Sequence, residues 1–255
     1  MDNNTGIERK IEEIEEEIKN TPYNKATQHH IGKLKAKLAQ LRENLIKKKS
    51  GGKGAGFGIR KMGDATVVLV GFPSVGKSTL INKLTDAKSK IADYEFTTLD
   101  VVPGIMNYKG VKIQIVDLPG LIDGASTGRG RGREVLSVVR NADLVLILLD
   151  AFHTEQVEVI GRELYDAGIR LGESPPRVRI KKTSRGGIIL SSSVEVKQIS
   201  ERTVKGILLT KGIHSAEVTL HEDLNEDRFI DAVMGNRVYI PSIIALNKID
   251  QLGDG

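Results

Sequence analysis

Apolar residues recur at helical spacing in two stretches near the N-terminus. The first stretch covers residues 7–18 and the second covers residues 31–45, each with isoleucine or leucine every three or four positions. This spacing places the apolar side chains on one stripe of a helix. A turn sequence at residues 20–24 separates the two stretches. The pattern predicts a helical hairpin over residues 1–50 whose two stripes are buried against each other.

Short apolar runs alternate with helical patterns from residue 65 onward. Strands are predicted at residues 66–70, 104–108, 111–116, 144–149 and 240–246. Lys109-Gly110 between the second and third strands is typical of a hairpin turn. Helices are predicted after the first strand to about Leu84, and at residues 134–140 and 155–167. Strands that alternate with helices predict an α/β fold with a mostly parallel sheet and helices on both sides.

Two segments interrupt this alternation. Residues 51–61 are rich in glycine and are predicted to form a linker. About ninety residues separate Asp150 from Ile240, where one helix and two loops need about thirty. Further strand and helix patterns there predict an inserted α+β subdomain at residues 168–238. The main domain is then formed by residues 62–167 and 239–255.

The composition excludes several classes of protein. The chain of 255 residues has no cysteine, which excludes disulfides and thiolate metal sites. Its longest apolar run is far shorter than the roughly 20 residues that a membrane span needs. The polar N-terminus does not resemble a secretory signal, and the five histidines show no ligand spacing. We therefore expect a cytoplasmic protein with no membrane partner.

The net charge of +5 is confined to one end of the chain. Residues 1–60 hold 13 Lys and Arg against 8 Asp and Glu, whereas the remaining residues hold 25 of each kind. A local basic excess favours a polyanionic partner such as RNA or the ribosome, without DNA specificity. The alternative is a basic helix face that is only solvated.

The strongest chemical motif follows the first predicted strand and precedes a predicted helix. It fits G-x-x-x-x-G-K-[ST] and consists of Gly71, Phe72, Pro73, Ser74, Val75, Gly76, Lys77 and Ser78, with Thr79 directly after it. Backbone N–H groups of such a loop surround phosphate oxygens at the N-terminus of the helix. Lys77 is expected to reach the β and γ phosphates, and the Ser78 hydroxyl is expected to bind Mg²⁺.

Two further motifs lie at the ends of later strands. Asp117 begins a D-x-x-G motif, in which its carboxylate is expected to hold Mg²⁺ and the Gly120 N–H is free to approach a γ phosphate. Asn247, Lys248 and Asp250 form an N-K-x-D motif. The carboxylate of Asp250 can accept two hydrogen bonds from guanine, and adenine has neither donor. This motif predicts GTP and GDP as the ligands.

The segment between the first two motifs carries a candidate metal ligand. A threonine at position 97 or 98 can complete the magnesium shell when a γ phosphate is present. A buried strand threonine is the alternative. The glycine- and arginine-rich stretch 124–133 is interpreted either as a switch whose arginines meet phosphate, protein or RNA, or as a solvated loop.

These motifs resemble those of the Obg-type GTPases, and most closely the developmentally regulated GTP-binding proteins. The resemblance covers residues 5–250 and includes residues 94–99, 117–125, 129–133 and 235–241. It implies a G domain with an insert, an N-terminal helical hairpin and a role in translation at the ribosome. It also implies that Thr98 is the magnesium ligand and that Lys77, Thr98 and Gly120 take part in catalysis.

The sequence departs from this family at two points. Family members continue beyond the N-K-x-D motif into a last strand and helix and a C-terminal TGS domain, so the chain is expected to be truncated. Ser74 stands where some potassium-activated relatives carry asparagine. A monovalent cation such as K⁺ is a second candidate cofactor, and this residue does not predict potassium dependence.

Three functions are compatible with these patterns. The first is a magnesium-dependent GTPase that acts as a switch at the ribosome, with a regulatory protein as a candidate partner. The second is an ATPase or kinase, which the Asn247–Asp250 motif argues against. The third is an RNA or ribosome adaptor that binds GTP without hydrolysing it. Intact Lys77, Ser78 and Asp117 favour hydrolysis over the adaptor.

Overall fold

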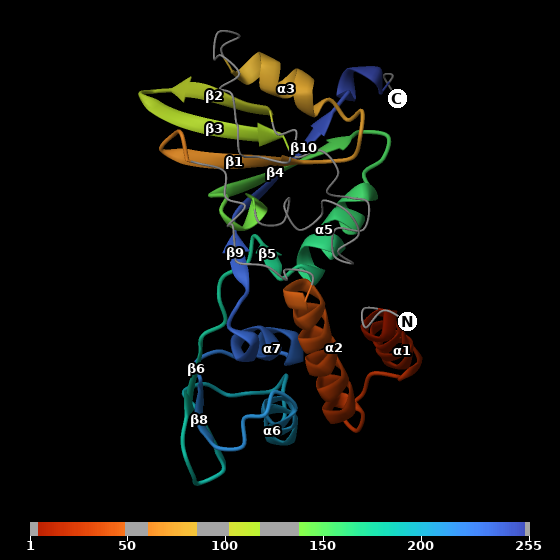
Figure 1. The fold of residues 1–255 in the computed structure, drawn as a ribbon, viewed down its shortest axis with the longest axis vertical. Helices are drawn as coiled ribbons and strands as arrows, with labels where there is room; N and C mark the ends of the chain where they lie inside the picture. Colours follow the sequence, from red (N-terminus) through yellow and green to blue (C-terminus); the bar gives the residue numbers. More distant parts are fainter. Residues whose placement is uncertain (1–4, 49–60, 86–101, 118–137, 253–255) are drawn as a thin grey trace. The chain divides into compact units, whose positions relative to one another are not determined.

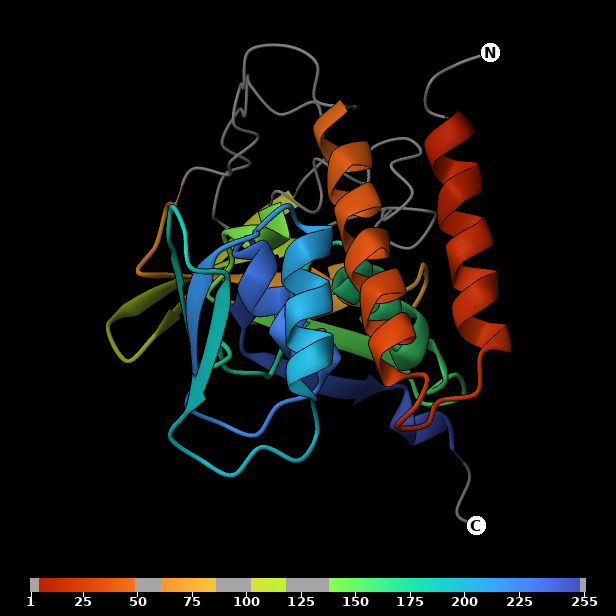
Figure 2. The same ribbon diagram turned by 90° about the horizontal axis from the view of Figure 1, so that it is seen from below.

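The computed structural model describes residues 5–48, 61–85, 102–117 and 138–252 (Figures 1 and 2). The chain forms two compact units. The first unit consists of residues 1–49 and 174–237, and the second unit consists of residues 50–173 and 238–255. Each unit has its own hydrophobic core. The predicted hairpin and the predicted insert therefore belong to the same unit in this structure.

The second unit is built on a five-stranded sheet with the order β10-β4-β1-β3-β2. The strands are β1 (Ala65–Val70), β2 (Val102–Tyr108), β3 (Val111–Asp117), β4 (Leu144–Asp150) and β10 (Ser242–Asn247). Only β2 is antiparallel, because it is joined to β3 by the predicted hairpin turn. The α/β class and the mostly parallel sheet are confirmed.

Helices cover both faces of this sheet. Val68 and Val70 of β1 pack in one core with α5 (Gln156–Asp166). Leu69, between them, packs in a second core with α3 (Lys77–Leu84). Successive side chains of a strand point to opposite faces, so a strand between two helical layers is apolar at every position. This is the physical reason for the continuous apolar runs in β1 and β4.

The predicted strand at residues 240–246 is wrong in one respect, because the structure divides it at Pro241. The part before the proline is β9 (Val238–Ile240), which pairs in parallel with β5 (Ile169–Leu171) in a separate two-stranded sheet. Proline has no N–H to donate to a sheet and so interrupts the hydrogen-bond ladder. The carbonyl of Pro241 still accepts a hydrogen bond from the Val145 N–H at 3.0 Å.

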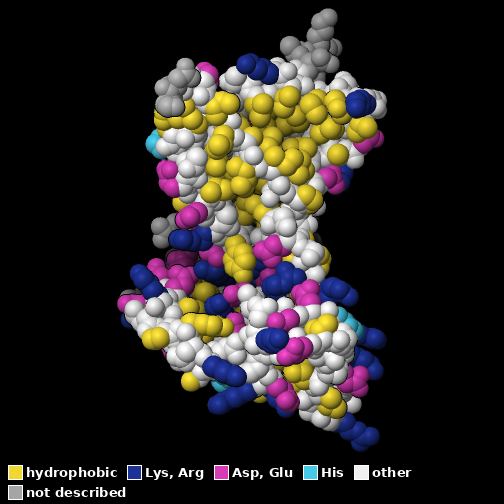
Figure 3. All heavy atoms as spheres, turned by 180° about the vertical axis from the view of Figure 1, so that it is seen from behind, with side chains coloured by type: hydrophobic (Ala, Val, Ile, Leu, Met, Phe, Trp, Pro, Cys, Tyr) yellow, Lys and Arg dark blue, Asp and Glu magenta, His cyan; other side chains and the backbone are white. Residues whose placement is uncertain are grey.

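Strand β10 is the edge strand of the described sheet beside β4. Its side chains Ile243, Ile244 and Leu246 are 53%, 55% and 50% exposed. Figure 3 shows a broad apolar area on one face of the second unit. The carboxyl ends of β1, β4 and β10 meet at one edge of the sheet, because the three strands are parallel. The motifs that follow β1 and β10 are therefore brought to the same edge.

The first unit contains the two predicted helices near the N-terminus, α1 (Thr5–Asn20) and α2 (Gln28–Lys48). They run antiparallel, since Arg42 lies 2.7 Å from Glu15 and His30 lies 2.9 Å from Glu17. Asn24 organises the turn between them, where its side chain accepts hydrogen bonds from the N–H groups of residues 26 and 27. None of the helices in the four described ranges is long and apolar enough to cross a membrane.

The predicted insert is an α+β structure within the same unit. A three-stranded sheet with the order β6-β8-β7 has helices packed on one face. Its elements are β6 (Val178–Lys182), β7 (Ile188–Ser192), α6 (Glu201–Thr210), β8 (Ala216–Leu220) and α7 (Glu226–Met234). Ser200 and Asn225 are the N-caps of the two helices and accept hydrogen bonds from Thr203 N–H and Arg228 N–H. Such caps satisfy N–H groups that a helix leaves unpaired.

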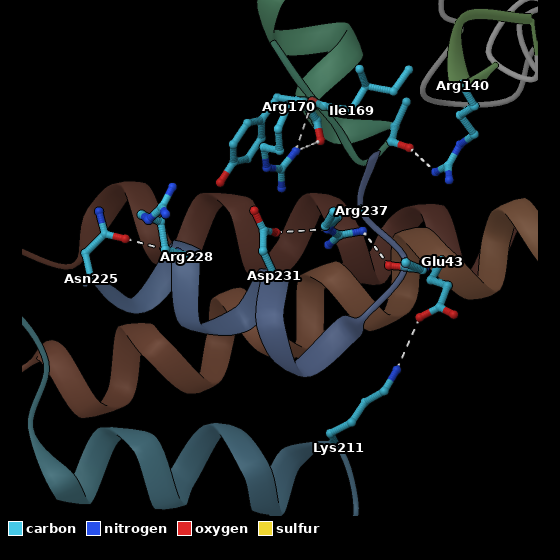
Figure 4. Close-up of polar contacts among 12 residues, drawn as sticks. Glu43, Arg140, Ile169, Arg170, Lys211, Asn225, Arg228, Asp231 and Arg237 are labelled. Atoms are coloured by element: carbon cyan, nitrogen blue, oxygen red, sulfur yellow. Dashed lines mark hydrogen bonds and ion pairs between the residues drawn. The ribbon is translucent and has the colours of Figure 1, made fainter. Parts of the chain in front are cut away.

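Helix α2 also packs against the insert, which the sequence analysis did not anticipate. Its small residues Ala36 and Ala39 contribute to the core formed by α6, α7 and the three strands. Polar contacts flank this packing. Lys35 lies 2.7 Å from Asp227. Lys211 lies 3.2 Å from Glu43, and Figure 4 shows this second contact. Helix α2 therefore has two buried stripes, one against α1 and one against the insert.

Candidate nucleotide-binding site

The loop between β1 and α3 has a backbone conformation that its glycines permit. Gly76 adopts a φ of 99°, which L side chains rarely adopt, and a Cβ there would collide with the Asn247 side chain. Gly71 packs so closely on the carbonyl of Leu148 that a Cβ would not fit. Ser74 has a φ of 64° although it is not glycine. Such local strain is concentrated at functional sites. The loop is thus held by neighbours in the shape expected of a P-loop.

Lys77 is the first residue of α3, and its side chain turns back into the loop. Its Nζ donates hydrogen bonds to the carbonyl oxygens of Gly71 at 2.9 Å and Phe72 at 3.0 Å. Burial lowers the pKa of the Lys77 ammonium, and the nearby Asp117 carboxylate acts in the opposite direction. The amine therefore lies within the loop, where it can exchange a carbonyl for a phosphate oxygen.

Ser78 and Asp117 come together although 39 positions separate them in sequence. The Ser78 hydroxyl donates to Asp117 Oδ2 at 3.2 Å. The other carboxylate oxygen, Oδ1, is buried and has no hydrogen-bond partner among the described residues. A buried carboxylate oxygen without a partner is costly unless a cation or water satisfies it. The donor set of a hydroxyl and a carboxylate is the hard oxygen chemistry that Mg²⁺ prefers, so these residues fit the ion.

The N-K-x-D motif is tied to the P-loop by Asn247. Its Nδ2 donates to the Val75 carbonyl at 2.8 Å. Asn247 is the last residue of β10, and Val75 lies in the loop after β1. The hydrogen bond therefore joins the end of the edge strand to the loop. The structure thus places both residues at the same edge of the sheet. The base-reading motif and the phosphate-binding loop are therefore fixed with respect to each other.

Lys248 has a partner that the sequence analysis missed. Its Nζ lies 2.7 Å from Asp150 Oδ2, and the N–H of Phe152 donates to Asp150 Oδ1 at 3.0 Å. Both hydrogen bonds hold the pKa of the Asp150 carboxyl below its usual range. Asp150 ends β4 and is in register with Asn247 on the neighbouring strand. An acidic residue at the end of an adjacent parallel strand was the signal that could have identified it.

Asp250 lies in a short 3-10 helix, Ile249–Gln251, directly after the lysine. Its side chain is exposed, whereas Lys248 is partly buried. An exposed carboxylate that follows a tethered lysine is accessible to the edge of a base. Of the remaining predicted loop residues, Phe72 packs on both cores of the second unit, and Pro73 and Thr79 are exposed.

Several predicted site residues lie outside the described residues. They are Thr97, Thr98, Gly120 and the stretch 124–133. Their roles stay predictions. Within the described part of the chain, no cluster of three or more His, Asp or Glu residues could hold a metal ion by itself.

A parallel sheet with a P-loop after β1, an aspartate after β3 and an N-K-x-D motif after β10 defines the G domain of a P-loop GTPase. Residues 66–182 match the model of the 50S ribosome-binding GTPase family, and residues 185–254 match the C-terminal region of the same domain. The chain belongs to the family of developmentally regulated GTP-binding proteins.

Two relatives from the curated proteins support this assignment. An uncharacterised GTP-binding protein of Methanocaldococcus jannaschii is 57% identical over 245 residues, which are 96% of this chain and 63% of that protein. Developmentally-regulated GTP-binding protein 2 of Homo sapiens is 49% identical over 97% of this chain and 69% of its own. The G domain of the T. maritima FeoB iron transporter is 30% identical over 42% of this chain, with a TM-score of 0.33. The chain thus spans about two thirds of the length of its curated relatives.

Proposed function

We propose that the second unit hydrolyses GTP to GDP and phosphate with Mg²⁺. The observation that supports this most directly is the convergence of Lys77, Ser78 and Asp117 at the P-loop. The buried carboxylate oxygen of Asp117 beside the Ser78 hydroxyl supports a metal site next to the loop. Phosphoryl transfer depends mainly on positioning and on neutralising charge, and these three side chains provide both.

Each residue has a defined task in this proposal. Lys77 leaves the carbonyl oxygens of Gly71 and Phe72 and binds the β and γ phosphates. Ser78 and Asp117 hold the metal ion, and Thr98 completes its shell. When bound, Mg²⁺ neutralises charge that develops on the phosphate oxygens. Gly120 donates its N–H to the γ phosphate.

The guanine base is recognised at the other end of the site. Asp250 accepts from the two guanine donors, and Lys248 lays its stem over the base. Adenine would leave the carboxylate without these partners, and the loss of a hydrogen bond to a charged group costs about 1.5–3 kcal/mol. The chain therefore selects GTP and GDP over ATP.

The switch is proposed to act at the ribosome during translation, in the cytoplasm. The matching family model is described as a ribosome-binding GTPase, and the basic excess near the N-terminus suits an RNA partner. A regulatory protein is a further candidate partner. Because the chain spans 63% and 66% of its two archaeal relatives, the partners of the whole protein are part of this proposal.

Single-turnover phosphate release from GTP tests the enzymatic part. We expect magnesium-dependent release by the full chain, and a loss of about a hundredfold or more in Lys77→Ala. Lys61→Ala is the matched control, since Lys61 lies at the opposite end of the sheet beside Asp143. GTP binding without any release, with or without K⁺ and ribosomes, would instead favour the adaptor that binds GTP without hydrolysing it.

A further inference from the structure

A groove lies between helices α2 and α6 of the first unit, with a volume of about 900 Å³. The two helices approach closely at Gly206, where a Cβ would collide with the His29 ring. Lys33 of α2 and Arg202 and Lys205 of α6 line the groove. Among the described residues that line it, Leu209, which is 48% exposed, is the only large apolar side chain. The groove is therefore open to solvent and basic on both sides.

The positive charge belongs to the first unit as a whole. This unit holds 22 Lys and Arg against 16 Asp and Glu, a net charge of +6, whereas the second unit holds 16 against 17. The hairpin and the insert contribute equally, so the basic excess is larger than the N-terminal sequence alone indicates. Figure 3 shows many Lys and Arg side chains on the face of this unit that it draws.

Glu201, the acidic residue among those that line the groove, already has a cationic partner, as does Glu43 farther along α2. Glu43 pairs with Lys211 at 3.2 Å (Figure 4), and Glu201 pairs with Lys205 at 2.6 Å. Among the described residues, Lys33 and Arg202 have no acidic side chain within 4.0 Å. Within the part of the chain that the structure describes, the groove thus keeps two cations without an ion-pair partner.

His29 also lines the groove, and its pKa is affected by these positive charges. Burial lowers the pKa of its imidazole, and the positive charges of Arg202 and Lys33 lower it further. Its Nδ1 is buried and has no hydrogen-bond partner among the described residues. The lowered pKa shows that the positive charges of Arg202 and Lys33 act on the same part of the groove, and an anionic ligand there would be attracted to both.

We propose that the α2–α6 groove binds the phosphate backbone of RNA. Lys33 and Arg202 contact phosphates, while the stems of Lys33 and Lys205 and the side chain of Leu209 contact the sugars. An acidic protein segment needs several apolar anchors to bind stably, and the groove offers only Leu209. This inference rests on the proposed association with ribosomes and assigns it to a particular surface.

Binding of a short fluorescein-labelled RNA duplex to the full chain tests the groove. Lys33→Glu/Arg202→Glu is expected to raise the Kd at least about tenfold and to reduce the slope of log K against log salt by about 2. Lys33→Gln/Arg202→Gln introduces no new negative charge and is expected to show a smaller loss in the same direction. Circular dichroism and thermal melting establish that each variant is folded.

Arg179→Glu/Lys182→Glu is the matched control. It replaces one arginine and one lysine of the same unit, both exposed on β6 and outside the groove. The proposal expects this control to retain most of the RNA affinity. Equal losses in both double variants, unchanged binding in the groove variant, or binding that inorganic phosphate or polyglutamate abolishes at low concentration would each overturn it.

Ribosome sedimentation distinguishes this inference from the proposed function. If the wild type sediments with ribosomes and the groove variant does so equally well, the groove assignment fails and the ribosome proposal stands. If the duplex binds through the groove but the wild type does not sediment, the ribosome proposal fails and the groove stands. GTP affinity is expected to be unchanged in all four proteins, because the nucleotide residues belong to the second unit.

Discussion

The Nζ of Lys248 lies 2.7 Å from Asp150 Oδ2, across the ends of two neighbouring parallel strands. The aspartate is itself fixed, because its second oxygen accepts the N–H of Phe152 at 3.0 Å. Lys248 adopts a φ of 60°, so its backbone is already turned sharply at this point. The ion pair therefore determines where the lysine stem lies and gives Asp150 a positioning role in the recognition of the base.

Substitution of Asp150 tests this role. Asp150→Asn keeps an oxygen for the Phe152 N–H but removes the charge that attracts Lys248. We expect the Kd values for GTP and GDP to rise by the same factor, about three- to tenfold. The Lys248–Asp150 ion pair affects the guanine base, which the two nucleotides share. Asp143→Asn, at the other end of β4, is the control and is expected to bind both nucleotides as the wild type does. A loss confined to GTP would indicate a defect at the phosphates instead.

The choice of base depends on Asp250. Asp250→Asn is expected to weaken GTP binding about tenfold to a hundredfold, because each lost charge-assisted hydrogen bond is worth about 1.5–3 kcal/mol. Xanthosine triphosphate is expected to bind better to this variant, since its 2-oxo group accepts from an amide donor. Isothermal titration with GTP and with xanthosine triphosphate measures this change in base preference. Equal GTP affinity in variant and wild type would refute the role of Asp250.

The local parts of the nucleotide site were predictable, because a few consecutive residues determine them. The P-loop needs glycine at position 76, where φ is 99°, and this requirement is visible in the sequence. The strands before the motifs were predictable from their unbroken apolar runs. The division of the last predicted strand also had a visible signal in Pro241, which lacks an N–H.

The parts that were missed all depend on contacts between distant segments. Asp150 meets Lys248 only because β4 and β10 are neighbours in register. The hydrophobic periodicity of a strand does not indicate which strand lies beside it. The packing of α2 against α6 depends on Gly32, which is buried in the first unit. An isolated glycine in a helix looks like a weak helix former until its neighbour is known.

The contribution of Asp143 to stability is expected to depend on pH. Its carboxylate accepts the Thr66 N–H at 2.8 Å and lies 3.1 Å from Lys61 Nζ. These contacts, the Thr66 N–H first, hold its pKa below the usual range. A depressed folded-state pKa stabilises the protein above the unfolded pKa of about 3.9, and this stability is lost as the pH falls through the folded pKa.

Thermal melting of Asp143→Asn measures this contribution. At neutral pH we expect the variant to melt about 1–3 °C below the wild type, which corresponds to about 0.5–1 kcal/mol after allowance for the exposed side chain. As the pH falls below about 4 and through the folded-state pKa of Asp143, the two melting temperatures are expected to converge, because the wild-type carboxyl is then protonated in both the unfolded and the folded state. A difference that stays constant as the pH falls well below about 4 would mean that the charge of Asp143 does not stabilise the fold.

The close contact of α2 with the insert changes what a deletion of the N-terminal hairpin can reveal. Removing residues 1–50 was the obvious test of RNA binding, since the nucleotide motifs lie beyond them. Ala36 of α2 belongs to the core of the insert, so this deletion would also expose that core. We expect the deletion to destabilise the insert, which is why point variants of exposed groove residues are the better probe.

Gly32→Ala measures the same contact without a deletion. Alanine favours a helix over glycine by about 1 kcal/mol, so a solvent-exposed site would gain stability. At Gly32, however, the new Cβ would lie 2.8 Å from Thr203 Cγ2, and Thr203 is fully buried and hydrogen-bonded to the cap Ser200. Overpacking of this kind typically costs about 1–3 kcal/mol.

We therefore expect Gly32→Ala to lower the stability of the first unit by up to about 2 kcal/mol despite its better helix propensity. Gly161→Ala in α5 is the matched control, because nothing lies within 4 Å of a Cβ built there. That variant is expected to be neutral or more stable by up to about 1 kcal/mol. Thermal melting measures the loss of stability. Hydrogen exchange of the α2 and α6 amides shows whether this loss occurs in the first unit. If both variants were stabilised alike, α2 would not be packed against α6, and the groove between them would have no structural basis.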